Sequence, residues 1–588
     1  MAIGTANGPG RSGGELTRRQ RYETMRGALI QERASFDSHW KELGDYFFPR
    51  RTRFWVTDRN KGDRRSQNII NSTPRLAART LQSGLHAGLT SPARPWMRLT
   101  TPDPDLAEHG AVKEWLHTVT QRMLTVFLRS NLYNALPTLY GDLGVFGTGA
   151  MAVMADEREM LRSYTYPIGS YAVGIDARGV ATTFVRDYEI TVRQAVEAFG
   201  AIPGTRDIDW TKLSEVVRSA WDKSQYDLPV EITWLVTPNT EYVAGSPWSR
   251  EFRWHSCYFE RGRPDDGIFL RESGFKQFPI LVPRWDVTGE DTYGTASPGM
   301  DALGDAKGLQ LLERRKARAI DKALDPPLVG PSTLRTQKTS LIPGDITYDD
   351  AGSRGSGQGL RPIHEVRLEG LQHVAMEIER HEYRVQRSFY ADLFLMLAQS
   401  DSMRGAQPVT AREIEERHEE KLLALGPVLE RMNDELLDPL VDRTFSLMLD
   451  AGAIPEPPEE LHGVDLKVEY ISVMAQAQKL VGVVGLDRFL QSSLLLAEKF
   501  PAVLHKVNAM QAINDYQDML GVNPKLVVPD DEAQAGVDAD RQAMAQQAGA
   551  EQAQRMAQAG AALGKTPLGG NTALDAMLNA AGSVGVGA

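Results

Sequence analysis

The segment GAALGKT, residues 560–566, contains the residue types with which many proteins cradle phosphate. In a phosphate-binding loop, four residues separate a first glycine from Gly-Lys-Ser/Thr, and the loop joins a buried strand to a helix. Only three residues follow Gly560 here, Ala559 stands where the first glycine should be, and no strand pattern precedes the segment. The sequence therefore predicts no nucleotide-binding site at this position.

Two further glycine-rich segments also lack the spacing that chemistry would need. GSRGSGQG, residues 352–359, departs from the dinucleotide-binding fingerprint and opens no helix, so we expect a flexible hairpin tip. GVFGTG, residues 144–149, is explained by a turn that enters a buried strand. Neither segment indicates a cofactor.

Candidate metal ligands and nucleophiles are equally sparse. His373 and Glu377 lie one helical turn apart and could hold a metal, but no HExxH pattern is present and a surface pair explains them. Cys257 lies near His255 in the extended run FRWHSCYFE, and we expect the two side chains to point to opposite faces of a strand. There is no GxSxG motif. We therefore predict no catalytic residue, no metal site and no cofactor.

Length and composition fit a large globular protein with several sub-domains. The 588 residues are 42% hydrophobic and 24% charged, and the single cysteine excludes an intramolecular disulfide. No apolar run approaches the roughly 18 residues of a membrane span, and the N-terminus lacks the apolar core of a secretory signal. A net charge of −11 argues against wrapping nucleic acid, although it allows a surface along which DNA slides.

Long amphipathic helices are the strongest pattern in the chain. Apolar residues recur at steps of three or four in three segments, 299–324, 369–398 and 410–452. In the second of these, the apolar line is interrupted only by His381. A small, polar break, AQSDSMRGAQPVT, lies between the last two, and we expect kinks at Gly426-Pro427 and Pro439. Helices of this length with polar flanks need neighbours, so we interpret them as the spine of an oligomer.

The remaining elements are predicted as follows. A helix begins after Thr17 and ends before Pro49, and helices cover about 68–90, 108–130 and 136–143. Residues 150–295 read as a mostly antiparallel β-rich region with runs such as YAVGID, VEITWLVTP and EYVAG. The basic, aromatic loop 49–65 is either a solvated loop or a contact with nucleic acid or a neighbouring subunit. After residue 530 the Ala/Gln/Gly-rich chain should be disordered or weakly helical.

Several strings, taken in order, resemble the portal proteins, the head-to-tail connectors of short-tailed double-stranded-DNA bacteriophages. They are WKELGDYFFPR, NSTPRLAARTLQSGLHAGLTSPARPWMRL, LYGDLGVFGTGAM and PVTAREIEER, and the resemblance covers roughly 17–525. It implies an α+β, mainly α portal fold. Such proteins form a ring, usually a dodecamer, at one capsid vertex, through which DNA packaging and DNA ejection proceed.

The resemblance also implies a division of the chain. Residues 1–16 would be a flexible arm, 17–298 the wing, 299–325 and 367–398 the two stem helices, and 326–366 the clip between them. Residues 399–409 would form the tunnel loop, 410–453 the kinked spine helix of the wing, 454–529 a helical crown, and 530–588 the C-terminal tail.

Two sets of site residues follow from this mapping. The tunnel loop would present to DNA the side chains of Gln399, Ser400, Asp401, Ser402, Met403 and Arg404. For Arg404, an ordinary surface position is an open alternative. The clip would offer a docking surface that includes Arg335, Lys338 and Arg354.

The implied partners are other copies of the chain, double-stranded DNA, the terminase large subunit, a tail adaptor protein, and the major capsid and scaffolding or internal core proteins. No membrane is involved, and the protein would reside in the virion after assembly in the host cytoplasm. Two alternatives remain open from the residues alone. The chain could be another virion or tail-adaptor structural oligomer, or a DNA-packaging enzyme, although the sequence shows neither a phosphate loop nor an acidic metal site.

Overall fold

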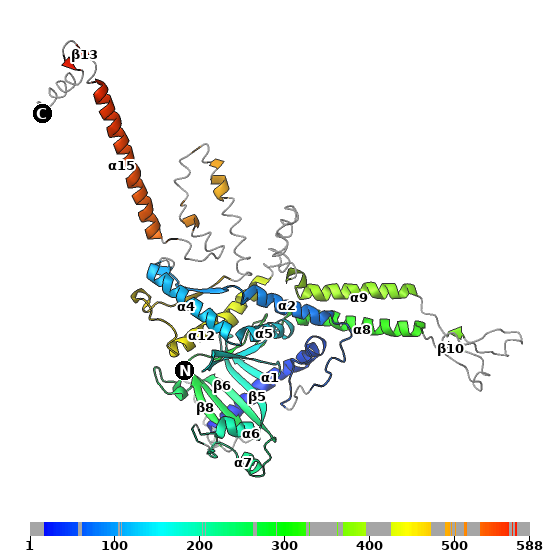
Figure 1. Cartoon of the computed structure of the whole chain (residues 1–588). Helices are drawn as coiled ribbons and strands as arrows, with labels where there is room; N and C mark the ends of the chain where they lie inside the picture. Colours follow the sequence, from blue (N-terminus) through cyan, green and yellow to red (C-terminus); the bar gives the residue numbers. More distant parts are fainter. Residues whose placement is uncertain are drawn as a thin grey trace, which may run out of the picture. The chain divides into compact units, whose positions relative to one another are not determined.

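The protein was analysed as a computed structural model (Figure 1). It describes residues 17–324 apart from 57–61, 104–105, 108, 203, 206, 263–266 and 290, then 368–394, 425–471 and 530–563, with short pieces at 328–329, 361–362, 489–493, 495–496, 500, 508, 511–513, 528, 567–568 and 571–572. Two compact units are distinguished. The first is drawn from 1–100, 116–456 and 466–478, and the second from 101–115, 457–465 and 479–588.

The N-terminal helices form where the sequence predicts them, with adjusted ends. Helix α1 (Arg18–Tyr46) begins at a capping box in which Thr17 Oγ1 accepts from Gln20 N and Gln20 Oε1 accepts from Thr17 N. Helix α2 (Thr73–Leu89) begins at Thr73 rather than 68, because Pro74 suits the first turn of a helix. Helices α4 (Gly110–Arg129) and α5 (Leu132–Phe146) follow. The buried Trp40 of α1 donates to the Phe146 carbonyl and so ties α1 to α5.

The β-rich region contains two antiparallel sheets. The larger has the order β4-β5-β6-β7-β8, formed by β4 (Tyr171–Ile175), β5 (Ala181–Thr191), β6 (Pro229–Pro238), β7 (Trp254–Glu260) and β8 (Arg271–Phe275). The smaller has the order β3-β2-β9, formed by β3 (Met160–Tyr166), β2 (Ala150–Asp156) and β9 (Ile280–Leu281). The predicted antiparallel pairing is confirmed. The strand expected at EYVAG is wrong, because residues 241–245 form turns, whereas β3 and β8 were not anticipated.

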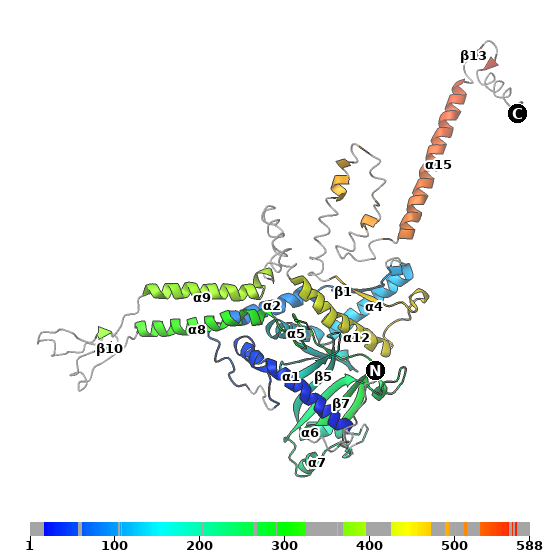
Figure 2. The same cartoon turned by 180° about the vertical axis from the view of Figure 1, so that it is seen from behind.

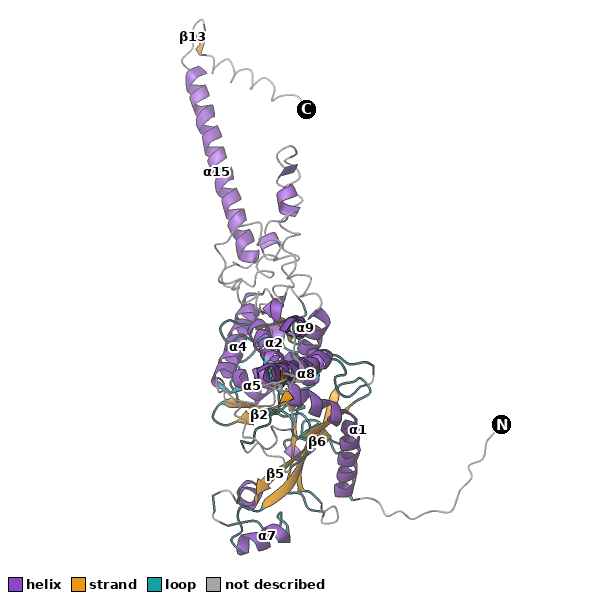
Figure 3. Cartoon of the chain, turned by 90° about the vertical axis from the view of Figure 1, so that its right-hand side faces the viewer, coloured by secondary structure: helices purple, strands orange, loops and turns teal. Residues whose placement is uncertain are grey.

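Helices cover both faces of the five-stranded sheet. On one face, Tyr22 and Leu29 of α1 pack against a cluster of buried sheet residues, Val185, Leu235, Cys257 and Phe259. On the other, the short helices α6 (Val192–Ala195), η1 (Val196–Gly200) and α7 (Glu215–Asp222) pack against Val230 and Ile232. Figure 3 shows α1 running beside the strands of this sheet. The alternation of apolar residues along the strands therefore serves two separate hydrophobic clusters.

Two long helices run side by side away from the sheets. These are α8 (Pro298–Leu324) and α9 (Leu368–Ser388), seen in green in Figures 1 and 2. The range 299–324 is confirmed, but the prediction of one helix to residue 398 is wrong. The chain leaves α9 after Ser388, and Tyr390 adopts a positive φ of 53° before a further turn of helix at 391–394. Buried Phe389 anchors this bend, with its ring tilted by 56° against that of Phe47 at 5.3 Å between ring centroids.

The helix predicted over 410–452 is described from residue 425. A π-helical segment, η6 (Asn433–Leu437), precedes α12 (Asp438–Asp450). Because Pro439 lacks an N–H, it cannot complete the hydrogen bonding of a regular interior turn, and it lies in the first turn of α12. Where the sequence predicts a kink at Pro439, the structure shows a change of helix type. The turn preceding Gly426-Pro427 lies outside the described residues.

Two C-terminal expectations are corrected. Strand β12 (Lys467–Tyr470), in the segment assigned to a helical crown, pairs antiparallel with β1 (Met97–Thr100). The tail contains one continuous helix, α15 (Asp530–Leu563), in place of a disordered or weakly helical segment. Alanine and glutamine favour helix strongly, and the described side chains of α15 are nearly all exposed, which agrees with the expectation that the tail builds no core. None of the described helices combines the length and apolar composition that crossing a bilayer requires.

Candidate functional site

The seam between α8 and α9 is the most extended feature that the sequence predicts as functional. Helices α8 and α9 are in contact, and Ile378 and Val385 of α9 and Leu309 of α8 are buried. His381, the one polar interruption in the predicted apolar line, has Nδ1 2.8 Å from Asp305 Oδ1 on α8. Arg384 Nη1 lies 3.4 Å from the same carboxylate oxygen. The polar side chain of His381 therefore has a partner across the seam, the carboxylate of Asp305.

Close approach of the two helices depends on Gly308. A Cβ atom at this position would lie 3.1 Å from His381 Cε1, tighter than an ordinary van der Waals contact. Gly304, one turn earlier on α8, has nothing within 4 Å of a corresponding Cβ. The glycine at 308 thus leaves room for the imidazole, whereas the glycine at 304 does not serve packing.

A polar clamp fixes the α8–α9 pair to the segment before α2. Gln310, 3% exposed, accepts from the backbone N–H groups of Ile70 (2.7 Å) and Asn71 (2.8 Å) and donates to the Asn71 carbonyl (2.9 Å). Asn71 Nδ2 donates to Glu313 Oε1 of α8 at 3.1 Å and to Glu382 Oε1 of α9 at 2.7 Å. One asparagine therefore holds both helices.

Sequence reasoning did not identify this clamp. Two features of the sequence could have indicated it. One is the polar residue Gln310 next to the apolar Leu309, and the other is the string NST immediately before Pro74. A polar side chain at a core position requires partners, so a search for them could have begun there. Its partner, however, is some 240 residues away in the chain.

The residues predicted to contact DNA and docking proteins lie outside the described part of the chain. These are the tunnel-loop residues Gln399, Ser400, Asp401, Ser402, Met403 and Arg404, and the clip residues Arg335, Lys338 and Arg354. The two ends of the predicted clip are described. Strand β10 (Leu328–Val329) pairs antiparallel with β11 (Arg361–Pro362), with Leu328 opposite Pro362.

Several described residues of the basic loop 49–65 contact the body of their own chain. Arg51 forms an ion pair with the buried Asp142 of α5; burial raises the pKa of the Asp142 carboxyl, and the Arg51 guanidinium opposes that shift. Thr52 makes a β-bridge with Ile168. Phe54 packs where Gly169 leaves room, whereas Trp55 is 75% exposed. One of the two aromatics thus anchors the loop and the other faces solvent.

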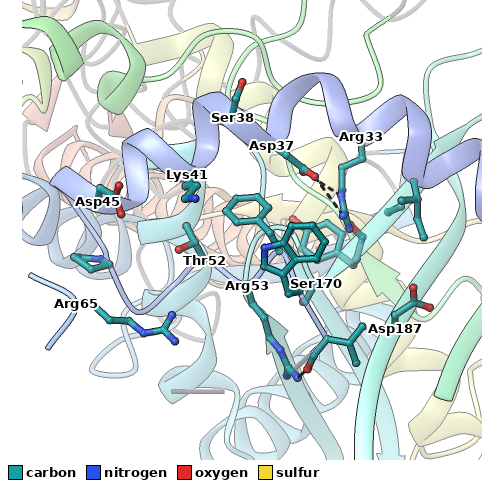
Figure 4. Close-up of a pocket in the computed structure, with 18 of the residues that line it drawn as sticks. Arg33, Asp37, Ser38, Lys41, Asp45, Thr52, Arg53, Arg65, Ser170 and Asp187 are labelled. Atoms are coloured by element: carbon teal, nitrogen blue, oxygen red, sulfur yellow. Dashed lines mark hydrogen bonds and ion pairs between the residues drawn. The ribbon is translucent and has the colours of Figure 1, made fainter. Parts of the chain in front are cut away.

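Beside this loop lies a cavity of about 700 Å³ between α1 and the sheet (Figure 4). Its charged lining is mostly paired internally. Arg33 contacts Asp37 and donates to the Tyr171 carbonyl at 3.1 Å, and Arg26 forms an ion pair with Asp187. Burial raises the pKa of Asp37, an effect that Arg33 opposes. The cavity shows charges that hold α1 on the sheet, and no arrangement of an acid, a base and a nucleophile.

A buried ion pair also fixes η6. Arg284, 7% exposed, pairs with Glu435, whose Oε2 additionally accepts from the Arg284 backbone N–H at 2.8 Å. The extra residue in the π-helical turn accompanies this contact, which joins the helical segment around 433–437 to the strand region near β9. A polar contact across 151 residues of sequence is not visible in any local pattern.

The cysteine and histidine considered above do lie on one face of β7, contrary to the expectation that they point to opposite faces. Residues two apart on a strand share a face. Burial raises the pKa of the Cys257 thiol, so the thiolate that would act as a nucleophile is disfavoured. His255, fully buried, instead lies 2.7 Å from Arg18 Nη2 and 3.3 Å from the Tyr22 hydroxyl.

The remaining chemical motifs gain no support. Within the described ranges, no three His, Cys, Asp or Glu side chains come together as a group that could hold a metal ion. The segment before Gly564 is helix α15 rather than the strand that a phosphate loop requires, and residues 564–566 themselves are outside the described part.

Comparison with known proteins gives consistent relatives. Residues 19–528 match the family described as bacteriophage head to tail connecting protein. The chain is 44% identical over 572 residues to the portal protein of Salmonella phage epsilon15, covering 96% of this chain and 99% of the relative. It is 43% identical over 537 residues to the probable portal protein of Bordetella phage BPP-1, covering 91% and 93%.

Solved structures show a more distant likeness. A chain of the virion of a native gene transfer agent particle matches with a TM-score of 0.29 and 11% identity, covering 80% of this chain and 96% of that one. A chain from the neck of an empty gene transfer agent particle gives a TM-score of 0.31 and 14% identity, covering 77% and 89%. Scores this low assign no fold by themselves.

Proposed function

This chain belongs to the bacteriophage head-to-tail connecting protein family, and we propose that it forms the portal ring at one capsid vertex, through which double-stranded DNA is packaged and ejected. Two relatives of almost the same length, which are named as portal and probable portal proteins, support the proposal. The function is structural: the protein connects the phage head to the tail.

The proposal of a ring rests mainly on the solvent exposure of α8 from residue 311 onward. From residue 311 to its end, the helix buries no side chain completely, and it leaves three large apolar side chains in solvent, Leu311 (46% exposed), Ile320 (39%) and Leu324 (81%). A helix that projects in this way gains little from its own chain beyond the contact with α9. Helices in proteins are stabilised mostly by packing, so we infer that neighbouring copies cover this part.

The division of labour along the chain is proposed on the same basis. Helices α8 and α9 are the paired stem helices, the insert 326–366 is the clip, and 399–409 is the tunnel loop. Residues 17–298 with the helical segment up to residue 453 make the wing, 454–529 the crown, and 530–588 an extension of it. The pairing of β10 with β11 supports the clip, because it brings together two segments near the start and the end of the insert.

The partners are proposed from the same mapping. The clip would dock the terminase large subunit during packaging and the tail adaptor protein afterwards. The wing and crown would meet the major capsid and the scaffolding or internal core proteins. A ring of twelve subunits at the vertex of the virion, assembled in the host cytoplasm, is the form that the family resemblance implies.

We propose no enzymatic activity. The thiol of Cys257 is buried, and GAALGKT is preceded by a helix instead of a strand. Conduction of DNA requires a passage and docking surfaces rather than bond chemistry. A second candidate, another structural oligomer of the virion or tail, would share the helix seam but form no open ring; a DNA-packaging enzyme would need a nucleotide site.

Negative-stain imaging and light scattering of the purified chain test the proposal. We expect discrete rings with an open axis and no ATP hydrolysis by the rings alone. A stable monomer, a closed assembly without an axial opening, or ATP turnover by the pure protein would each contradict it.

A further inference from the structure

The α8–α9 pair has two sides that differ in charge. One side is defined by the clamp, where Asn71 contacts both Glu313 of α8 and Glu382 of α9; we call it the Asn71 side. The seam itself is marked by Asp305 and His381. With 3.6 residues per turn, a residue about 140–160° around either helix from these glutamates lies on the opposite side of the pair. We call that opposite side the basic side.

On α8 the basic side carries a row of exposed cations. Arg314, Arg318 and Lys322 follow one another at steps of four and therefore form one stripe, with Arg315 beside it. Arg318 lies five residues from Glu313, which is about 140° around the helix. Within the described residues none of these four cations makes an ion pair or hydrogen bond. The exposed Leu311 lies on the same stripe.

Helix α9 continues the basic side. Arg384 lies two residues from Glu382, and Arg380 lies two residues on its other side, so each is about 160° around the helix from that glutamate. Arg384 also contacts Asp305 at the seam, and Arg380 contacts Glu377. Their side chains are 52% and 64% exposed, so they retain much of their surface for another contact.

The Asn71 side has the complementary character. Glu313, Glu379 and Glu382 give it negative charge, and Ile320 and Leu324 add exposed apolar surface. Glu379 is exposed and makes no ion pair within the part of the chain that the structure describes. Lys316 lies about 160° around α8 from Arg318 and only about 20° from Asp305, so it lies near the seam and on neither of the two sides.

From these two sides we infer that the stem contact between adjacent copies is heterologous and electrostatically matched. The basic side of one copy packs on the Asn71 side of the next, with Leu311 on one side and Ile320 and Leu324 on the other as its apolar centre. This inference rests on the proposed ring. A ring closed by rotation needs two different, complementary surfaces on one subunit, and this pair of helices carries both.

DNA is the competing occupant of the basic side, since phosphates bind unpaired arginines. Contact with DNA would use the cations but would leave the apolar and acidic residues of the Asn71 side without a partner. A second copy satisfies both sides at once. A stem lining dense in arginine would also grip the phosphates that a conduit must let pass. The charge pattern therefore favours a neighbouring subunit.

Arg318→Glu tests the inference against a matched control, Lys316→Glu. Both make the same charge change on the same helix two residues apart, and neither residue has an ion pair in the described structure that would be lost. We expect Arg318→Glu to raise the concentration at which rings dissociate by about tenfold or more at low salt, because it places like charges together. The rise should shrink in 1 M salt, where the screening length is about 3 Å. Lys316→Glu should leave rings as stable as those of the unaltered chain.

A charge reversal on the Asn71 side should have the same effect as Arg318→Glu. Glu379→Lys is therefore expected to weaken rings at low salt and less so at high salt. Circular dichroism of each variant verifies that the helices remain. Equal ring stability in Arg318→Glu and Lys316→Glu would overturn the inference while leaving the ring itself intact. Intact rings of Arg318→Glu that retain DNA poorly would assign the basic side to DNA instead. Failure of the unaltered chain to form rings would count against the proposed function.

Discussion

His381 of α9 and Asp305 of α8 face each other across the seam, with 2.8 Å between Nδ1 and Oδ1. They are 76 residues apart in sequence, on either side of the insert. The contact fixes the sliding position of one helix on the other, because apolar contacts alone would tolerate a shift along the seam. The seam therefore has a defined register.

Asp305→Ala should loosen this seam. The substitution removes the partner of His381 and of Arg384, and a partly exposed charged contact of this kind contributes about 1 kcal/mol. We expect faster hydrogen exchange at the α9 amides around residue 381, with the rest of the chain unchanged. Asp321→Ala on the exposed end of α8 is the control. Equal exchange in the two variants would show that the seam does not depend on Asp305.

Gly308 and Gly304 should respond differently to alanine. At Gly304 nothing obstructs a Cβ, so Gly304→Ala should stabilise α8 by up to about 1 kcal/mol through helix propensity. At Gly308 the added Cβ meets His381 at 3.1 Å, so Gly308→Ala should gain less and Gly308→Val should separate the helices. Hydrogen exchange of α8 and α9 amides measures each effect. A gain at 308 as large as that at 304 would contradict the tight contact.

Gln310→Ala should detach the α8–α9 pair from the Asn71 segment. It leaves the partly buried N–H groups of Ile70 and Asn71 without their acceptor, which costs about 1–2 kcal/mol. Gln310→Glu keeps the acceptor but cannot donate to the Asn71 carbonyl, so an intermediate loss is expected. Proteolysis at residues 66–72 and urea unfolding measure the effect. The exposed Gln386→Ala should change neither, and a matching loss there would refute the local explanation.

Acidification should weaken the contact of α1 with the sheet through Glu272. The pKa of Glu272 is lowered from its ordinary value of 4.5, chiefly by the hydrogen bond with His255 and also by Arg18. Because the folded pKa is the lower one, this contribution is complete above pH 4.5 and is lost as the pH falls through the folded pKa. Urea unfolding over a pH series should show a smaller acid-induced loss in Glu272→Gln than in the unaltered chain.

The exposed Glu241, 3.8 Å from Arg18, provides the comparison for that series. Glu241→Gln should retain the full acid dependence, because a charge so open to solvent contributes little. If Glu272→Gln followed the same curve as Glu241→Gln, the acid dependence would have to come from other carboxylates.

Deletion of residues 400–406 should separate assembly from DNA handling. The segment joins two helical regions and contains Gly405, and we predict that it faces DNA as part of the tunnel loop. Rings should form normally, while packaging into heads or retention of packaged DNA should fall. Counting full and empty heads by electron microscopy provides the measurement. Normal numbers of full heads would remove the tunnel-loop role.

Local patterns predicted the elements well where one helix face or one strand face is decided by nearby residues. Thr17 predicted the start of α1, and the apolar steps from Leu309 predicted α8. The end of α9 was missed because Phe389 and Leu393 continue the apolar periodicity, although the backbone turns at Tyr390 to bury Phe389 beside Phe47. The apolar periodicity indicates which residues are buried, but it does not indicate whether those residues belong to one continuous helix.

The contacts that position the helices could not be read from the sequence. The contact between Asn71 and Glu382 spans 311 residues of sequence, and the contact between Arg284 and Glu435 spans 151. Each residue alone has an ordinary type for its place. The tail shows the opposite case, since low hydrophobicity was taken as weak structure, whereas its alanine- and glutamine-rich sequence favours the helix α15.

The pairing of Leu328 with Pro362 makes the insert a self-contained branch. The strand pair holds Leu328–Val329 against Arg361–Pro362, so we expect changes between Val329 and Arg361 to leave Asp305 and His381 in place. Under the proposed docking role, phages that recruit different tails would exchange this branch without altering the helix pair. An engineer could likewise graft a foreign adaptor there, since only the spacing of one strand pair has to be respected.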